Sequence, residues 1–186
     1  MPNIYIIGGC NGAGKTTAAY HLLPKVFKTV EFVNADEIAR GLSPFNPTGV
    51  AFHAGRIMLN RIERLIEEKK NFSFETTLSG LSYLKLINKA KEEGYAVTLF
   101  FVYLSGVDLA RERVALRVNK GGHNIPGDVI ERRYYKGLKN FLKYAAEAND
   151  WYIYDNSGSE YILIAKSIDG NENIFNFETF RKMKKE

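Results

Sequence analysis

Residues 4–17 read IYIIGGCNGAGKTT, and this stretch decides the fold. An apolar run of strand length leads into a complete G-x-x-x-x-G-K-[ST] pattern, which spans Gly9 to Thr16 and is followed by a helical stretch. A strand, a glycine-rich turn and a helix in this order predict a phosphate-binding loop, because glycines let successive backbone N–H groups point at phosphate oxygens. The chain is therefore predicted to bind a nucleoside triphosphate.

Two side chains of this loop carry the expected chemistry. Lys15 brings a positive charge to the β- and γ-phosphates, and the Thr16 hydroxyl is placed to hold Mg²⁺ that arrives with ATP. The start of the following helix adds the positive end of its dipole. The expected nucleotide contacts are Gly9, Asn11, Gly12, Ala13, Gly14, Lys15, Thr16 and Thr17.

Length and composition favour a single globular domain over residues 1–186, since 45% of the residues are hydrophobic and 13% are aromatic. A single cysteine excludes an internal disulfide framework, so the reducing cytoplasm is the expected compartment. No run approaches about 18 consecutive apolar residues, so no membrane association is expected. The net charge of +5 favours anionic partners, and the basic residues at 181–186 are expected to form a solvated end of the chain.

Strand-like runs alternate with helical patterns along the chain. Strands are expected at 4–8, 31–36, 71–76, 96–104 and 151–155, with a sixth at 161–167 lying antiparallel at the edge. Helices are expected after the loop and at 49–70, 82–94, 108–120 and 129–147. This alternation predicts an α/β P-loop NTPase fold, a three-layer sandwich around a mainly parallel sheet of five to six strands.

Polar residues follow three of these strands, at the sheet edge where such folds bind ligands. They are Asn34-Ala35-Asp36, Glu75-Thr76-Thr77 and Asp155-Asn156-Ser157. Asp36 is a candidate base for an acceptor hydroxyl, and its structural alternative is the N-cap of the next helix. Glu75 matches the strand-then-carboxylate pattern of a Mg²⁺-organising residue, but it could equally bind a substrate hydroxyl beside Thr77, or be purely structural.

A helical lid is expected over about residues 111–133, where two arginine-bearing helices flank a Gly-Gly loop. Its five arginines are Arg111, Arg113, Arg117, Arg132 and Arg133, of which two or three are expected to touch nucleotide and the others to be solvated. His123 in the loop is expected to stabilise the loop rather than to catalyse. No Cys/His or His/carboxylate spacing typical of zinc occurs, so Mg²⁺ carried by ATP is the only metal expected.

Five motifs in this order resemble the zeta-toxin family of P-loop kinases, and more narrowly its small stand-alone branch, often labelled predicted ABC-type ATPases or kinases. The motifs are GGCNGAGKTT (8–17), NADEIA (34–39), FSFETTLSG (72–80), RVNKGGHNIPGDVIERRY (117–134) and YIYDNS (152–157). The resemblance covers about residues 3–166. It implies an ATP-dependent kinase in which Lys15 is the phosphate-loop lysine and Asp36 activates the acceptor hydroxyl.

The resemblance also implies that Glu75 and Thr77 bind the acceptor and that Arg117 and Arg133, with Arg132 beside them, hold the γ-phosphate. In the family the acceptor is a sugar hydroxyl of UDP-N-acetylglucosamine, and a protein antitoxin is a further partner. This chain departs from the pattern in its short length and its Gly-Gly-His lid, which leaves the acceptor and the toxin role open. Arg56, on the helix over 49–70, is a candidate acceptor contact, with a solvated position as an equal alternative.

Three other functions are weighed against a small-molecule kinase. An ABC-type ATPase is disfavoured because Leu81 follows Leu-Ser-Gly where a second glycine is expected, and because WYIYD ends in Asp-Asn rather than Asp-Glu. A nucleic-acid-end kinase would suit the basic charge and the eleven tyrosines, but no RNP-like motif occurs, so nucleic acid is not expected as a partner. A catalytically silent nucleotide-binding partner is disfavoured by the intact phosphate loop and carboxylates.

Overall fold

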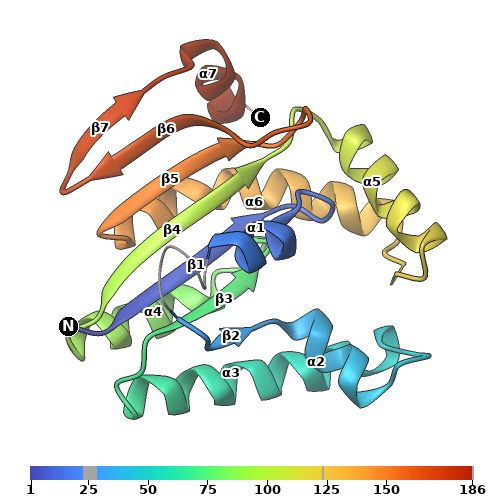
Figure 1. Cartoon of the computed structure of the whole chain (residues 1–186), viewed down its shortest axis with the longest axis horizontal. Helices are drawn as coiled ribbons and strands as arrows, with labels where there is room; N and C mark the ends of the chain where they lie inside the picture. Colours follow the sequence, from blue (N-terminus) through green and yellow to red (C-terminus); the bar gives the residue numbers. More distant parts are fainter. Residues whose placement is uncertain (23–28, 123, 186) are drawn as a thin grey trace.

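The computed structural model describes residues 1–22, 29–122 and 124–185, and among these the strands form one sheet in the order β2-β3-β1-β4-β5-β6-β7 (Figure 1). The strands are β1 (Asn3–Gly9), β2 (Phe32–Val33), β3 (Phe72–Thr76), β4 (Ala96–Tyr103), β5 (Asp150–Asp155), β6 (Ile162–Ile168) and β7 (Asn171–Ile174). The first five are parallel, and β6 and β7 continue the sheet antiparallel. The expected mainly parallel sheet is confirmed.

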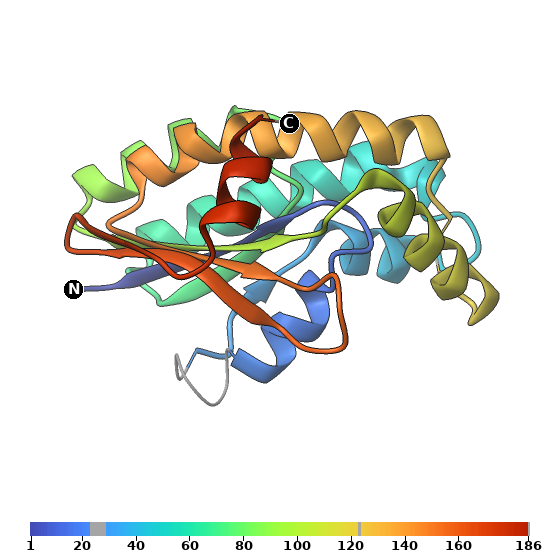
Figure 2. The ribbon, with the colours of Figure 1, turned by 90° about the horizontal axis from the view of Figure 1, so that it is seen from above.

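The helices cover the two faces of the sheet unequally, which gives the expected three layers. They are α1 (Lys15–Leu22), α2 (Ala35–Leu42), α3 (Ala51–Glu67), α4 (Ser82–Glu92), α5 (Val107–Asn119), α6 (Gly127–Glu147) and α7 (Phe177–Lys185), with a 3₁₀ turn η2 at Thr48–Val50. Figure 2 shows α3, α4, α6 and α7 on one face of the sheet and α1 on the other. None of the described helices combines the length and the apolar character that crossing a membrane requires.

Strand β1 lies in the middle of the sheet and is buried on both faces. Ile6 belongs to the main core under the large helical layer, whereas its neighbour Ile7 packs with Ala19 and Phe100 under α1. Both isoleucines are fully buried, because successive side chains of a strand point to opposite faces and both faces are covered here. The continuous apolar run IYII is thus explained by its central position.

The structure corrects two expectations near the C-terminus. The strand expected at 161–167 pairs antiparallel with β5, but β7 lies outside it, so the sheet has one strand more than expected and β6 is not at its edge. The basic residues near the chain end are exposed, as expected, but they belong to a helix, α7, which packs on the sheet through the buried Phe180 and Met183. The Phe180 ring stacks on Trp151 of β5 at 6.5 Å between centroids. The lysines and arginine obscured this apolar stripe in the sequence.

Candidate active site

The phosphate loop joins β1 to α1, and its glycines are required both by backbone conformation and by close neighbours. Gly12 and Gly14 have φ of +81° and +89°, which side-chain-bearing residues rarely adopt. A Cβ atom at Gly12 would lie 2.8 Å from the carbonyl oxygen of Ala110 in α5, and one at Gly14 would lie 2.7 Å from the amide nitrogen of Asn156. Helix α5, part of the expected lid, and the residues after β5 therefore pack directly on the loop.

The connection between β5 and β6 supports this loop from outside. Asn156 donates its side-chain amide to the Ala13 carbonyl at 2.8 Å, and the Tyr161 hydroxyl donates to the Gly14 carbonyl at 2.8 Å. The position of Asn156 at a strand end indicated a place in the site, whereas Tyr161 carries no such pattern and was missed. Both side chains bind carbonyl groups of the loop and therefore do not compete with phosphate oxygens for its N–H groups.

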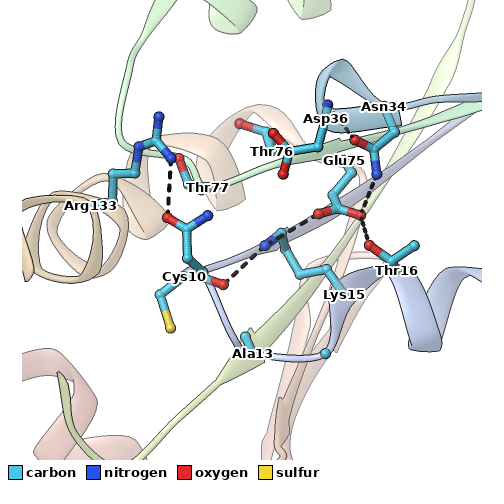
Figure 3. Close-up of polar contacts among 12 residues, drawn as sticks. Cys10, Ala13, Lys15, Thr16, Asn34, Asp36, Glu75, Thr76, Thr77 and Arg133 are labelled. Carbon is cyan, nitrogen blue, oxygen red and sulfur yellow. Dashed lines mark hydrogen bonds and ion pairs between the residues drawn. The ribbon is translucent and has the colours of Figure 1, made fainter. Parts of the chain in front are cut away.

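Glu75, at the end of β3, connects the phosphate loop to the start of α2 (Figure 3). One carboxylate oxygen accepts hydrogen bonds from the Thr16 hydroxyl at 2.7 Å and from the Asn34 amide at 3.0 Å. The other lies 3.4 Å from the ammonium nitrogen of Lys15, which also donates to the Cys10 carbonyl at 3.0 Å. Glu75 and Lys15 are only 10% and 6% exposed, so they form a buried, fully partnered pair.

Asn34 rather than Asp36 caps helix α2, so the capping alternative for Asp36 is wrong. The Asn34 side-chain oxygen accepts the backbone N–H groups of Asp36 and Glu37, as an N-cap does. The carboxylate of Asp36 is exposed and lines the cavities described next. It is therefore available for chemistry.

Two cavities meet at Asp36 and Glu75. The phosphate-loop cavity, of about 180 Å³, is also lined by Asn11, Gly12, Gly14, Lys15, Thr16, Thr17, Arg113 and Arg117. The strand-end cavity, of about 230 Å³, lies on the other side and includes Thr77, Ser79, Tyr83 and Arg133. Asn11, Lys15, Asp36 and Glu75 line both, so the two spaces share a wall that contains the base candidate and the Lys15–Glu75 ion pair.

The wall of the strand-end cavity at Leu78-Ser79-Gly80 is held by α6. Asn140 donates its amide to the Leu78 carbonyl at 2.8 Å, and Tyr144 donates its hydroxyl to the Gly80 carbonyl at 2.7 Å. A Cβ atom at Gly137 would lie 2.6 Å from the Thr77 carbonyl oxygen, so the helix and this loop are in backbone contact. Ser79 and Gly80 of the Leu-Ser-Gly tripeptide are thus part of the wall of the strand-end cavity.

Arg133, on α6, points into the same region. Its guanidinium donates to the side-chain oxygen of Asn11 in the phosphate loop at 3.2 Å. Burial lowers the pKa of Arg133 and the nearby carboxylate of Asp36 opposes this shift, which shows that Asp36 and Arg133 are electrostatic neighbours. Arg132, the next residue, is exposed.

The three arginines of α5 have different surroundings: two line the phosphate-loop cavity, and one forms ion pairs away from it. Arg113 donates to the carbonyls of Ser157 and Gly158 and lines the phosphate-loop cavity with Arg117. Arg111 forms an ion pair with Asp108 within α5 and a second one with Glu131, which joins α5 to α6. Sequence reasoning chose Arg117 but not Arg113, since equal residue types on one helix do not reveal which face meets the loop. His123 lies outside the described residues.

A third cavity, the basic cavity, opens between α2 and the end of α5. It has about 510 Å³ and is lined by Arg40, Arg113, Leu116, Arg117, Lys120, Gly121 and Gly122. Arg56, the candidate acceptor contact, is instead exposed on α3, and the strand-end cavity is lined by other side chains. The role of Arg56 as an acceptor contact stays a prediction.

Two side chains near the phosphate loop have oxygen atoms that could bind Mg²⁺. Thr16 and Glu75 offer hard oxygen atoms, which Mg²⁺ prefers. Among the described residues no group of three or more His, Cys, Asp or Glu could hold a metal alone. Phosphate oxygens would therefore have to complete the coordination, as at other phosphate-loop sites.

The parallel sheet, the phosphate loop at the end of β1 and the arginine-bearing α5–α6 segment define the class of P-loop kinases. The chain belongs to the zeta toxin family, whose model matches residues 1–167. It is 32% identical to an uncharacterised protein of Haemophilus influenzae over 126 residues, which cover 68% of this chain and 88% of that protein.

Two solved structures show the same fold at low sequence identity. A chain of the AvrRxo1-ORF1:-ORF2 structure with ATP matches with a TM-score of 0.80 and 18% identity over 99% of this chain and 64% of that chain. This protein thus spans less than two thirds of that relative. A chain from the PezAT chromosomal toxin-antitoxin system of Streptococcus pneumoniae matches with a TM-score of 0.66 and 15% identity, over 99% and 84% of the two chains.

Proposed function

We propose that this chain transfers the γ-phosphate of ATP, bound with Mg²⁺, to a hydroxyl group of a small molecule. The observation that carries the proposal is the position of Asp36 on the wall between the phosphate-loop cavity and the strand-end cavity. An acceptor in the strand-end cavity would present its hydroxyl to the carboxylate on one side and to the γ-phosphate on the other. Holding two reactants in this way supplies much of the rate enhancement in phosphoryl transfer.

Residues that line the two cavities have distinct roles in this proposal. Asp36 orients the acceptor hydroxyl and takes its proton, while Lys15, Arg117 and Arg133 stabilise the charge on the transferring phosphoryl group. Thr77 lines the cavity that would receive the acceptor. Mg²⁺, when bound, neutralises phosphate charge and fixes the phosphate oxygens.

The basic cavity supports an acceptor that itself carries negative charge. Arg40 lies one helical turn after Asp36, about 6 Å along α2, and faces Arg117 and Lys120 of the lid across this cavity. A ligand with its hydroxyl at Asp36 and a phosphate group near Arg40 would fit both features. A nucleotide sugar such as UDP-N-acetylglucosamine has this form.

A protein antitoxin and a cytoplasmic location belong to the same proposal. The PezAT neighbour comes from a toxin-antitoxin system, and the AvrRxo1 neighbour was solved as a complex of two proteins. A protein that occupied the lid and the basic cavity would stop nucleotide and acceptor from entering. Acidic side chains would suit the arginines there.

The test is to incubate the chain with labelled ATP and Mg²⁺ and to ask which molecule gains a phosphoryl group. The panel contains UDP-N-acetylglucosamine, uncharged N-acetylglucosamine, its 1-phosphate, an RNA with a free 5′-hydroxyl and a bacterial metabolite extract, each repeated with Asp36→Asn. Transfer to a charged sugar that depends on Asp36 supports the proposal. Transfer to RNA alone would establish a nucleic-acid-end kinase, and ATP hydrolysis without any labelled acceptor would establish an ATPase.

A further inference from the structure

The outer side of helix α6 carries four cations, here called the α6 stripe, which line none of the three cavities described above. They are Arg132, Lys136, Lys139 and Lys143, and all four are exposed. Intervals of four, three and four residues place them on one side of the helix, over a length of about 17 Å. Residues 132–146 include no Asp or Glu, so this part of the helix does not balance the charge of the stripe.

The rest of the described fold does not use the side chains of the α6 stripe. Within residues 1–22, 29–122 and 124–185 they form no ion pair and no hydrogen bond. Lys91 of α4, by contrast, pairs with Glu147 at the end of α6 at 3.2 Å. Like charges four residues apart destabilise a helix, so the stripe does not serve the stability of α6. Its charges are available to an anionic partner.

An exposed aromatic ring borders the stripe. Tyr135 lies three residues after Arg132 and four before Lys139, so its side chain is a neighbour of both on the helix surface. Its ring is 43% exposed and makes an edge-to-face contact with Tyr134, at 5.2 Å between centroids. Tyr134 is itself anchored, because its hydroxyl donates to the Leu104 carbonyl at 2.8 Å. The Tyr135 ring is thus held beside the cations.

Helix α7 adds positive charge next to this surface. Phe141 of α6 contacts Trp151 at 5.8 Å between centroids, and Trp151 stacks on Phe180 of α7, so the two helices share one aromatic cluster. Figure 2 shows the C-terminal end of α7 beside α6. The exposed basic residues of this helix include Arg181, Lys184 and Lys185. The positive surface therefore continues from one helix to the next.

We infer that the α6 stripe binds the backbone of a single-stranded nucleic acid and that Tyr135 stacks on one of its bases. A row of lysine and arginine side chains neutralises phosphates without reading the sequence. An exposed ring beside such a row accepts any base, because every base has a π face, and a base is free to stack only when it is not paired.

Other anionic partners suit the α6 stripe less well. A helix that enters a membrane surface needs a free apolar face, whereas the apolar face of α6, including Leu138 and Phe141, is buried. The inference departs from the expectation that nucleic acid is not a partner, which was based on the missing RNP-like motif. A stripe at helical spacing leaves no such motif in the sequence. The inference does not depend on kinase activity or on any acceptor.

The test measures fluorescence anisotropy of a short labelled poly-uridine RNA with the whole chain at several salt concentrations. A non-hydrolysable ATP analogue and Mg²⁺ are present in excess, so that the phosphate loop is occupied. Four phosphate contacts predict a slope of about −3 for the logarithm of the binding constant against the logarithm of the salt concentration. Lys139→Gln/Lys143→Gln should weaken binding about tenfold or more at low salt and reduce the size of this slope by about 1.4.

Three further variants separate the stripe from net charge and from the ring. Arg64→Gln/Lys70→Gln removes two exposed positive charges near the end of α3 and should change neither affinity nor slope. Lys139→Arg/Lys143→Arg keeps the charge and should retain binding. Tyr135→Leu should weaken binding about fivefold or more and leave the slope unchanged, because stacking releases no counterions. The melting temperature of each variant confirms that it folds.

Several results would overturn the inference. They are no binding of the RNA at low salt, equal losses in the two glutamine double variants, and duplex RNA bound as tightly as the single strand with no effect of Tyr135→Leu. Binding of vesicles of phosphatidylglycerol and phosphatidylcholine, but not of RNA, would assign the stripe to a membrane instead. The same sequence as DNA tells whether the sugar matters; binding of either strand supports the inference.

These results are separable from those of the transfer assay. RNA binding that depends on Lys139 and Lys143 would support the inference even if no acceptor in the panel gained phosphate. Lys139→Gln/Lys143→Gln should transfer phosphate to a small acceptor at the wild-type rate, since neither lysine lines a cavity of the site. Transfer to a sugar without any RNA binding would support the proposed function and reject this role for the α6 stripe.

Discussion

The side-chain oxygen of Asn34 accepts the backbone N–H of Asp36 at 2.8 Å, so the residue two positions earlier performs the capping of α2. Asp36 lies in the first turn of this helix, and because Asn34 is the cap, the carboxylate of Asp36 does not have to serve as one. The same short turn also gives Asn34 its bond to Glu75. One asparagine therefore positions both carboxylates of the site.

Replacement of Asp36 by Asn should separate catalysis from folding. Transfer should fall by about two orders of magnitude or more, since a positioned base contributes that much, while the melting temperature and nucleotide affinity should hold. Asn34→Ala is the comparison, because loss of the cap should cost about 1 kcal/mol of unfolding free energy. Near wild-type transfer by Asp36→Asn would reject Asp36 as the base.

Replacement of Lys15 by Ala should abolish turnover or greatly weaken nucleotide binding. No other described side chain brings an ammonium group to the Cys10 carbonyl and Glu75, so nothing replaces its charge at the phosphates. Binding of the ATP analogue and the transfer rate are both measured. An unchanged transfer rate would contradict the role of the phosphate loop.

Neutral replacement of Arg117 and Arg133 together, by glutamine, should lower turnover far more than it lowers stability. Both lie at the cavities beside the phosphate loop, where charge develops during transfer. The transfer rate is compared with the midpoint of urea unfolding, and Arg132→Gln shows how much its exposed neighbour contributes. Retained activity with a loss of stability would mean that these arginines are structural.

Gly137→Ala should destabilise the chain even though alanine favours helices. The added Cβ would meet the Thr77 carbonyl oxygen at 2.6 Å, and moving backbone apart should cost about 1–3 kcal/mol. Gly55→Ala in α3 is the control, because nothing lies within 4 Å of its added Cβ and the substitution should stabilise by up to about 1 kcal/mol. Urea unfolding of both variants checks this; equal shifts would contradict the close contact.

Stability should fall above pH 9 in a way that depends on Cys10. Burial raises the pKa of its thiol from 9.0 to about 11, so the folded chain keeps the proton over a range in which the unfolded chain loses it. The stabilisation is complete below pH 9 and is lost as the pH rises toward 11. Cys10→Ala should therefore lose less melting temperature than wild type between these values.

The sequence predicted the fold where one local pattern decides the structure. The phosphate loop, the central strands and the helices near 82–92 and 127–147 follow from glycine spacing, continuous apolar runs and helical periodicity. Strand β7 was not predicted from the sequence because its residues, NENI, are mostly polar and it pairs with β6 alone. Helix α7 was not predicted because only two of its residues, Phe180 and Met183, form its buried apolar side, and charged residues surround them in the sequence.

The positions of the carboxylates in the site could be predicted from the sequence. The side chains that hold the phosphate loop and helix α2 in place could not. Asp36, Glu75 and Thr77 lie at or just beyond the ends of β2 and β3, and strand ends converge in a parallel sheet. Arg113 and Tyr161 reach the loop only through the packing of α5 and through the β5–β6 connection. The capping role of Asn34 depends on where α2 begins, and a sequence locates that start only to within a few residues.

Helix α6 contacts both cavity walls: it carries Arg133 to the phosphate loop and, further along, holds the loop at Leu78–Gly80. The opposite wall comes from α2, next to an edge strand of two residues, and α2 packs extensively on α3. We therefore expect the two walls to be separable, with α6 holding the phosphate-loop side and α2 with α3 forming the wall at which an acceptor would be selected. Grafting residues 37–67 from a relative with a different acceptor, which leaves Asp36 in place, should redirect the enzyme without rebuilding its catalytic centre.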